Sequence, residues 1–239
     1  MARTDRTAQS IRPLRFERAY TEQAAGSVLA IAGRTKVLCT VCVQESVPQW
    51  LNGQGKAWLS AEYSMLPAAT RTRKLRDGRL GRIDARSLEI QRLIGRALRA
   101  VVDLRALPEL TLWVDCDVLE ADGGTRTTAI NGACLAIHDA LLSLQDAGRL
   151  SRWPMHGLVS AISIGRVQNE FLVDLDYKED SAADLDLNVV RLGDDRLVEV
   201  QGSAERGTYT DDELNAMLVL SKEACRQVAT AQQLALETR

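Results

Sequence analysis

One pattern occurs twice along the chain and limits the folds open to it: two strand-like segments joined near a glycine, then further strand pattern and a long helix. The first copy starts at "GSVLAIAGRTKVLCTVCVQE" (26–45), whose β-branched segments meet around Gly33. The second starts at "GLVSAISIGRVQNEFLVDLDYKED" (157–180), and we predict its turn at Gly165–Arg166. A repeated unit of this kind predicts two similar halves.

Helical patterns complete each half. An apolar stripe runs over about 86–104, a second follows Gly124, and the last predicted helix opens with Thr210 and Glu213 at the spacing of a capping box. Because strands, hairpins and helices alternate, we predict an α+β fold of two similar β-α halves, with helices packed on mixed sheets. The 239 residues, 46% of them hydrophobic, suffice for one large domain. We therefore expect a single domain, residues 1–239, with pseudo-repeated halves at about 10–150 and 151–239.

Composition points to a cytoplasmic protein. The basic N-terminal stretch has no apolar run behind it, so it does not resemble a signal peptide, and no segment approaches the ~20 apolar residues of a membrane span. The cysteines number five, an odd count spread through apolar segments. Cys39 and Cys42 form a Cys-x-x-Cys, but strand periodicity places them on opposite faces, which favours a structural role over a redox or zinc pair.

The net charge of −2 is the sum over a chain that contains one strongly basic and one strongly acidic segment. Residues 71–105 carry eleven Lys and Arg against four Asp and Glu, whereas residues 170–213 carry fourteen acids against four bases. The polar stretch 67–86 predicts a mobile basic loop. Such a loop could follow a nucleic-acid backbone.

A glycine pair stands where a helix begins. In "VLEADGGTRTTAINGAC" (118–134), strand pattern passes through Gly123 and Gly124 directly into helix pattern. A helix start offers unpaired N–H groups to an anion, and Arg126 adds a forked cationic donor. The stretch lacks the Gly-Lys-Ser/Thr ending of a Walker loop. Taken alone it predicts a phosphate cradle only weakly, because most glycine turns before helices bind nothing.

Carboxylates alternate with apolar residues on two later strand patterns. Asp174 and Asp176 would share one strand face, as would Asp184, Asp186 and Asn188. Crowded carboxylates repel one another unless a cation lies between them, and oxygen ligands suit Mg²⁺ or Mn²⁺. Solvated strand faces are the alternative. Together, an anion cradle, an acidic cluster and a basic loop indicate phosphoryl or nucleotidyl transfer on a polynucleotide.

The chain resembles the ribonuclease PH family along nearly its whole length. The matching blocks are "RTDRTAQSIRPL", "GSVLAIAGRTKVLCTVCVQESVPQWLNGQGKAWLSAEYSMLP", "RSLEIQRLIGRALRAVVDL", "VDCDVLEADGGTRTTAINGAC", "LDLDYKEDSAADLDLNVV" and "LVEVQGSAE". The resemblance implies a duplicated β-α fold and a phosphorolytic 3′→5′ exoribonuclease, or tRNA nucleotidyltransferase. Such an enzyme removes nucleotides after the CCA end of tRNA precursors: inorganic phosphate attacks the terminal phosphodiester and a nucleoside diphosphate leaves. The implied assembly is a homohexamer, a trimer of dimers.

The resemblance also assigns site residues. The phosphate-binding residues it implies are four: Arg86, Gly124, Thr125 and Arg126. The implied catalytic groups are Arg126 and the acidic pair Asp180 and Asp186, which would hold the divalent metal, Mg²⁺ or alternatively Mn²⁺. Asp180 follows from the resemblance alone, since the strand pattern favours Asp184 and Asp186.

The chain departs from the family pattern at four positions: Ser64, Ala68, Ala85 and Ser203. At Ser64 and Ala68 the family usually has glycine and arginine, so one basic contact to tRNA is missing. Neighbouring loop arginines would supply the RNA contacts: Arg71, Arg73 and Arg76.

Two other functions fit parts of the pattern. A non-catalytic RNA-binding ring subunit of the same fold would be expected to have lost phosphate or metal residues, which this chain keeps. A small-molecule phosphotransferase would need a nucleotide-binding loop, and it would leave the basic loop without a role.

Overall fold

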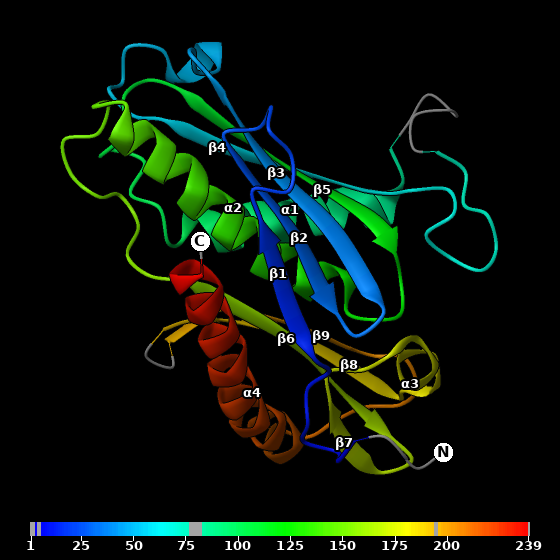
Figure 1. Ribbon diagram of the computed structural model, residues 1–239. Helices are drawn as coiled ribbons and strands as arrows, with labels where there is room; N and C mark the ends of the chain where they lie inside the picture. Colours follow the sequence, from blue (N-terminus) through cyan, green and yellow to red (C-terminus); the bar gives the residue numbers. More distant parts are fainter. Residues whose placement is uncertain (1–2, 4–5, 77–82, 194–195, 239) are drawn as a thin grey trace.

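The structure is a computed structural model and describes residues 3, 6–76, 83–193 and 196–238. Within these ranges the chain folds into two β-sheets and four α-helices (Figure 1). No helix in this part of the chain combines the length and the apolar composition needed to cross a membrane.

The first half builds a five-stranded sheet and two helices. Its elements are β1 (Leu14–Arg18), β2 (Gly26–Ala32), β3 (Thr35–Gln44), a 3-10 turn (Gln49–Leu51), β4 (Trp58–Met65), α1 (Ala85–Arg99), β5 (Thr111–Glu120) and α2 (Thr125–Asp146). The strand order is β1-β2-β3-β5-β4. Only β4 and β5 pair in parallel, so this sheet is mixed.

The second half builds a smaller sheet. Its elements are β6 (Val159–Val167), β7 (Glu170–Val173), α3 (Tyr177–Ala182), β8 (Leu185–Leu192), β9 (Arg196–Ala204) and α4 (Asp211–Glu237). The order is β7-β6-β8-β9 and every pairing is antiparallel. Helix α4 lies along one face of this sheet (Figure 1), and Thr210 and Glu213 form its predicted capping box.

Helix α2 joins the two halves. It packs on β2 and β3 of the first sheet and on β6 of the second, and most of its residues are buried. Asn131 in the middle of α2 exchanges two hydrogen bonds with the backbone of Ala161 in β6, at 2.7 and 2.9 Å. The predicted α+β fold with two β-α halves is confirmed, and the start of α2 is held at the junction of the halves.

The turn predicted at Gly165–Arg166 is wrong. Strand β6 continues through Gly165, and the hairpin turns at Gln168 and Asn169, both with positive φ (51° and 65°). Gly165 is needed for close packing, because a Cβ there would lie 2.5 Å from Cδ1 of Leu175. Asparagine tolerates the left-handed conformation of a two-residue hairpin turn, so the turn does not need the glycine.

The shared strand face predicted for Asp174 and Asp176 is also wrong. Strand β7 ends at Val173, and Asp174 has a φ of 55°. Its buried carboxylate is bound by Arg12. Asp176 instead caps α3, accepting hydrogen bonds from the backbone N–H groups of Lys178 and Glu179. Both carboxylates therefore have structural partners.

Other local predictions can be compared directly with the structure. Cys39 is buried and Cys42 exposed on β3, which confirms their placement on opposite strand faces. Helix α1 ends at Arg99, earlier than the predicted end near residue 104.

Candidate active site

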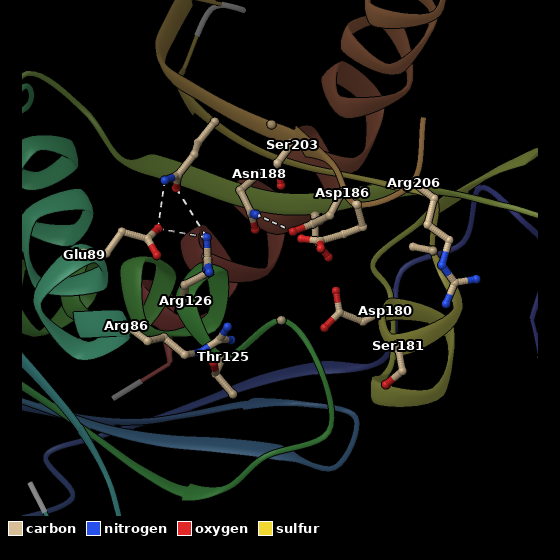
Figure 2. Close-up of a pocket in the computed structure, with 16 residues that line it drawn as sticks. Arg86, Glu89, Thr125, Arg126, Asp180, Ser181, Asp186, Asn188, Ser203 and Arg206 are labelled. Carbon is tan, nitrogen blue, oxygen red and sulfur yellow. Dashed lines mark hydrogen bonds and ion pairs between the residues drawn. The ribbon is translucent and has the colours of Figure 1, made fainter. Parts of the chain in front are cut away.

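A cleft of about 600 Å³ lies between the two halves. The start of α1 and the start of α2 form one side, and α3, β8 and β9 form the other (Figure 2). The residues assigned to chemistry from the sequence all line it: Arg86, Gly124, Thr125, Arg126, Asp180 and Asp186. Elements far apart in the sequence thus bring these groups to one place.

The first turn of α2 offers free backbone donors to the cleft. Gly124, the N-cap residue, has a left-handed conformation (φ 63°, ψ 24°) and no side chain to cap the helix. The first intrahelical bond runs from Thr128 N–H to the Gly124 carbonyl, at 3.0 Å. Within the described chain, no acceptor binds the N–H groups of Thr125 and Arg126, and no acidic residue lies in this turn. These donors and the positive end of the helix dipole suit an anion.

Gly123, one residue earlier, makes the close approach between the halves. Its φ is 75°, and a Cβ there would lie 2.4 Å from the carbonyl oxygen of Leu175 in the loop before α3. The Gly123 carbonyl accepts a hydrogen bond from the Thr35 hydroxyl, at 2.7 Å. The glycine pair therefore serves two purposes: Gly123 permits the packing, and Gly124 leaves the helix start open.

Two arginines place positive charge at the helix start. Arg126 Nη1 contacts Glu89 Oε1 at 3.2 Å and Gln201 Oε1 at 3.4 Å. Gln201 Nε2 in turn donates to Glu89 Oε1, at 2.8 Å, so a closed triangle holds the guanidinium (Figure 2). Arg86 is exposed at the start of α1 and lines the same side. The pair would bind a phosphate through charge-assisted bonds.

Two carboxylates project from the opposite side (Figure 2). Asp180 comes from α3 and Asp186 from β8, where Asp186 pairs with Gly165 on one neighbouring strand and Ser203 on the other. Burial and the charge of Asp180 raise the pKa of Asp186 to about 6. Burial also raises the pKa of Asp180 above its ordinary value. Both carboxyls are therefore poorly stabilised as anions by the protein alone.

The acidic pair fits a divalent ion completed by other oxygens. Asn188 donates to Asp186 Oδ2 at 3.1 Å, whereas Asp186 Oδ1 is buried with no hydrogen-bond partner among the described residues. Within the same residues, no three Asp, Glu, His or Cys side chains gather as a metal cage. Mg²⁺ is commonly held by one or two carboxylates, with waters and substrate phosphates completing the shell. The orphaned oxygen and the two carboxylates match that pattern.

The predicted RNA-binding arginines lie outside the cleft. Arg71, Arg73 and Arg76 are exposed, and none lines it. Next to Arg73, Lys74 forms an ion pair with Asp84, at 3.2 Å. Residues 77–82 of the predicted basic loop lie outside the described residues.

Several residues that line the cleft, and one buried behind it, were not predicted. Glu89 is one turn after Arg86 on α1, a spacing that could have placed it beside the phosphate site. Buried Tyr63 of β4 donates its hydroxyl hydrogen to Thr125 Oγ1, at 2.8 Å, and no sequence pattern indicates that contact. Gln201 and Arg206 reach the cleft from β9 and its end. Asp184, grouped with Asp186 in the prediction, precedes β8 and does not line the cleft.

Comparison with known proteins identifies the family. The 3′ exoribonuclease family, domain 1, matches residues 10–143, and domain 2 of the same family matches residues 157–224. The two matches span most of the chain and include every cleft residue discussed above. The chain belongs to the 3′ exoribonuclease family, which is the ribonuclease PH family.

Solved structures share the fold at low sequence identity. Rrp46 from rice (Oryza sativa) is 20% identical with a TM-score of 0.77, covering 96% of this chain and 97% of that one. A chain of the Archaeoglobus fulgidus exosome with RNA bound to the active site is 23% identical with a TM-score of 0.78, covering 95% and 91%. A chain of an archaeal exosome core is 21% identical with a TM-score of 0.76, covering 95% and 89%. These likenesses show the duplicated β-α fold.

Proposed function

We propose that this protein is a phosphorolytic 3′→5′ exoribonuclease that uses inorganic phosphate and releases nucleoside diphosphates. The observation that carries the proposal is the single cleft in which an anion-ready helix start and two arginines face an acidic pair. Membership of the 3′ exoribonuclease family supports action on an RNA 3′ end.

In the proposed reaction, the N–H groups of Thr125 and Arg126, with the Arg86 and Arg126 guanidinium groups, bind the attacking phosphate. A phosphate oxygen forms a bond to the terminal phosphorus of the RNA as the bond from that phosphorus to the 3′ oxygen breaks. Arg126 would stabilise the negative charge that accumulates on the phosphoryl oxygens. A divalent ion held by Asp180 and Asp186 would supply charge neutralisation at the scissile phosphate. Because the bonds exchanged are of similar energy, the reaction should be reversible.

The proposed substrates are 3′-extended tRNA precursors and other structured RNA 3′ ends. The exposed arginines of residues 71–76 would contact the RNA body away from the cleft. The proposed assembly is a homohexamer built as a trimer of dimers, and the likeness to exosome core chains supports a ring.

The second candidate is a non-catalytic RNA-binding ring subunit. The fold shared with rice Rrp46 and with chains of archaeal exosome structures favours it. A subunit of this kind has no need for an open helix start with two arginines opposite an acidic pair, and the cleft here has all of these groups. The two candidate functions therefore differ in whether the protein degrades RNA in this cleft.

One assay separates them. The protein is incubated with a 3′-extended tRNA and Mg²⁺, with and without phosphate, and the released nucleotides are identified. We expect nucleoside diphosphates only when phosphate is present, and no release from an Asp180→Asn, Asp186→Asn double variant. RNA binding without release in either condition would support the ring subunit, and monophosphates formed without phosphate would indicate a hydrolase.

A further inference from the structure

Three arginines near the N-terminus, Arg3, Arg6 and Arg12, bind carboxylates of the segment that runs from Asp174 into helix α3. Arg12 also reaches the start of α2. The side chain of Arg12, which is 6% exposed, makes a two-pronged bond to Asp174: Nε to Oδ2 at 2.9 Å and Nη2 to Oδ1 at 2.7 Å. Its Nη1 donates to the carbonyl of Asp122, at 2.6 Å. One buried guanidinium thus ties the loop before α3 to the residue that precedes the glycine pair.

The same arginine supports two unusual backbone conformations. Asp174 has a φ of 55°, which is unfavourable for a residue with a side chain, and its carboxylate also accepts the backbone N–H of Arg12, at 2.6 Å. On the other side, Nη2 of Arg12 would lie 2.7 Å from a Cβ at Gly124, so the guanidinium packs directly against the N-cap of α2. Arg12 therefore contacts the backbone segment that precedes α2 and the loop that precedes α3.

Arg3 and Arg6 bind the helix that carries Asp180. Arg3 contacts Glu179 through Nε to Oε1 at 2.5 Å and Nη2 to Oε2 at 2.8 Å, and Arg6 Nη2 contacts the same Oε2 at 3.0 Å. These side chains are 4%, 9% and 12% exposed for Arg3, Arg6 and Glu179. Glu179 immediately precedes Asp180 in the chain.

Helix α3 itself buries no side chain. It has six residues, none of them buried, whereas Leu175 before it and Ala183 after it belong to a small buried cluster. A helix this short is unstable without outside contacts. Its own side chains contribute the capping box, in which Glu179 also accepts the backbone N–H of Asp176, at 2.9 Å, and the ion pairs of Glu179. The position of Asp180 therefore depends in part on the ion pairs of Glu179.

We propose that Arg3, Arg6 and Arg12 are positioning residues, which fix the Asp180 carboxylate relative to the phosphate-binding helix start. The catalytic consequence rests on the proposed phosphorolytic function. None of the three lines the cleft, so they would act through Glu179 and Asp174. A misplacement of ~1 Å in a catalytic group can cost on the order of 100-fold in rate, so contacts behind the cleft can control turnover.

The test uses Glu179→Gln, because glutamine can still complete the capping box while losing the charge that binds Arg3 and Arg6. Glu213→Gln is a matched control. Glu213 completes the capping box of α4 in the same way and pairs with Arg166, yet it does not line the cleft. Each variant thus loses one capping-box carboxylate and its ion pairs, which are with Arg3 and Arg6 for Glu179 and with Arg166 for Glu213.

We expect Glu179→Gln to lower kcat for RNA phosphorolysis about tenfold at saturating phosphate. The KM for phosphate should not change, since the helix start and its arginines are untouched. Arg3→Gln should also lower kcat, and it replaces Glu179→Gln in the test if that variant folds poorly. Glu213→Gln should leave kcat unchanged.

A second readout does not depend on turnover. Mn²⁺ binding is followed by electron paramagnetic resonance in the presence of phosphate, and Glu179→Gln should bind Mn²⁺ more weakly than either wild type or Glu213→Gln. If the wild-type protein releases no nucleotide, the proposed function fails, while the Mn²⁺ comparison still decides the positioning role. A lower kcat or a weaker Mn²⁺ affinity in Glu179→Gln, not seen in Glu213→Gln, supports the proposal. If the two variants have the same kcat and the same Mn²⁺ affinity, the proposal is overturned.

Discussion

The Asp186→Asn variant should be more stable than the wild type at neutral pH when no metal is present. The pKa of Asp186 is raised from 3.8 to about 6 by burial and by the neighbouring charge of Asp180. At ~1.4 kcal/mol per pKa unit, keeping this carboxylate ionised costs the folded protein about 3 kcal/mol above pH 6. Asparagine keeps the side-chain size and an oxygen that can accept from Asn188, so the substitution mainly removes that cost.

The stability difference between Asp186→Asn and wild type should grow as the pH rises. Because the folded pKa of Asp186 lies above the unfolded value, the folded state holds the proton more tightly. Its stabilising contribution is fully present below about pH 4 and is lost as the pH rises through 6. The difference in unfolding free energy between variant and wild type should therefore be small at pH 4 and reach about 3 kcal/mol at pH 8.

Urea unfolding midpoints of both proteins, measured from pH 4 to pH 8 with a chelator present, provide the assay. Saturating Mg²⁺ should then stabilise the wild type, by about 2.7 kcal/mol at a hundred times its Kd, and the variant much less. Equal urea midpoints for wild type and variant at pH 8 would refute this reasoning, as would a difference between them that shrinks as the pH rises. Either result would mean that the ionised Asp186 carboxylate does not destabilise the metal-free protein.

Three further variants test the phosphate site, the RNA contacts and the packing between the halves. Arg126→Ala removes charge-assisted bonds worth about 1.5–3 kcal/mol, so phosphorolysis rates at limiting phosphate should fall at least about tenfold while filter-binding assays show RNA still bound. Neutralising Arg71, Arg73 and Arg76 together should weaken tRNA binding and reduce its salt slope by up to ~0.9 per lost phosphate contact, with short oligonucleotides still trimmed; equal losses on both substrates would indicate a structural role. Gly123→Ala should destabilise the fold by about 1–3 kcal/mol in urea unfolding, because the new Cβ meets the facing backbone at 2.4 Å.

The sequence predicted those parts of the fold that depend on local patterns. An apolar run located β2, all of whose residues are buried, and period-two alternation located β3. Apolar spacing located α1 and α2. Helix-end chemistry predicted an anion site at the glycine pair before α2, only weakly when taken alone, and this role stays a prediction. Asp180 required the family resemblance, since it lies on a short exposed helix with no periodic signal.

The parts that local patterns could not predict depend on tertiary contacts. The hairpin of β8 and β9 contains an irregularity between Val190 and Arg191, so Asp186 faces Ser203 and Asn188 faces Gln201. A regular ladder continued from the pair Arg191–Leu197 would place Gly202 opposite Asp186 and Val200 opposite Asn188. Gly165 likewise resembles a turn residue, and its true constraint, the Leu175 side chain, comes from a different element.

Inorganic phosphate is the proposed nucleophile, and it would attack in the cleft between the halves. The direct test supplies isotopically labelled orthophosphate together with a 3′-extended tRNA and Mg²⁺. We expect the label to appear in the β-phosphate of the released nucleoside diphosphates, and Arg126→Ala to suppress its incorporation. Label that stays in orthophosphate, whether nucleoside monophosphates accumulate or no nucleotide is released, would contradict this proposal.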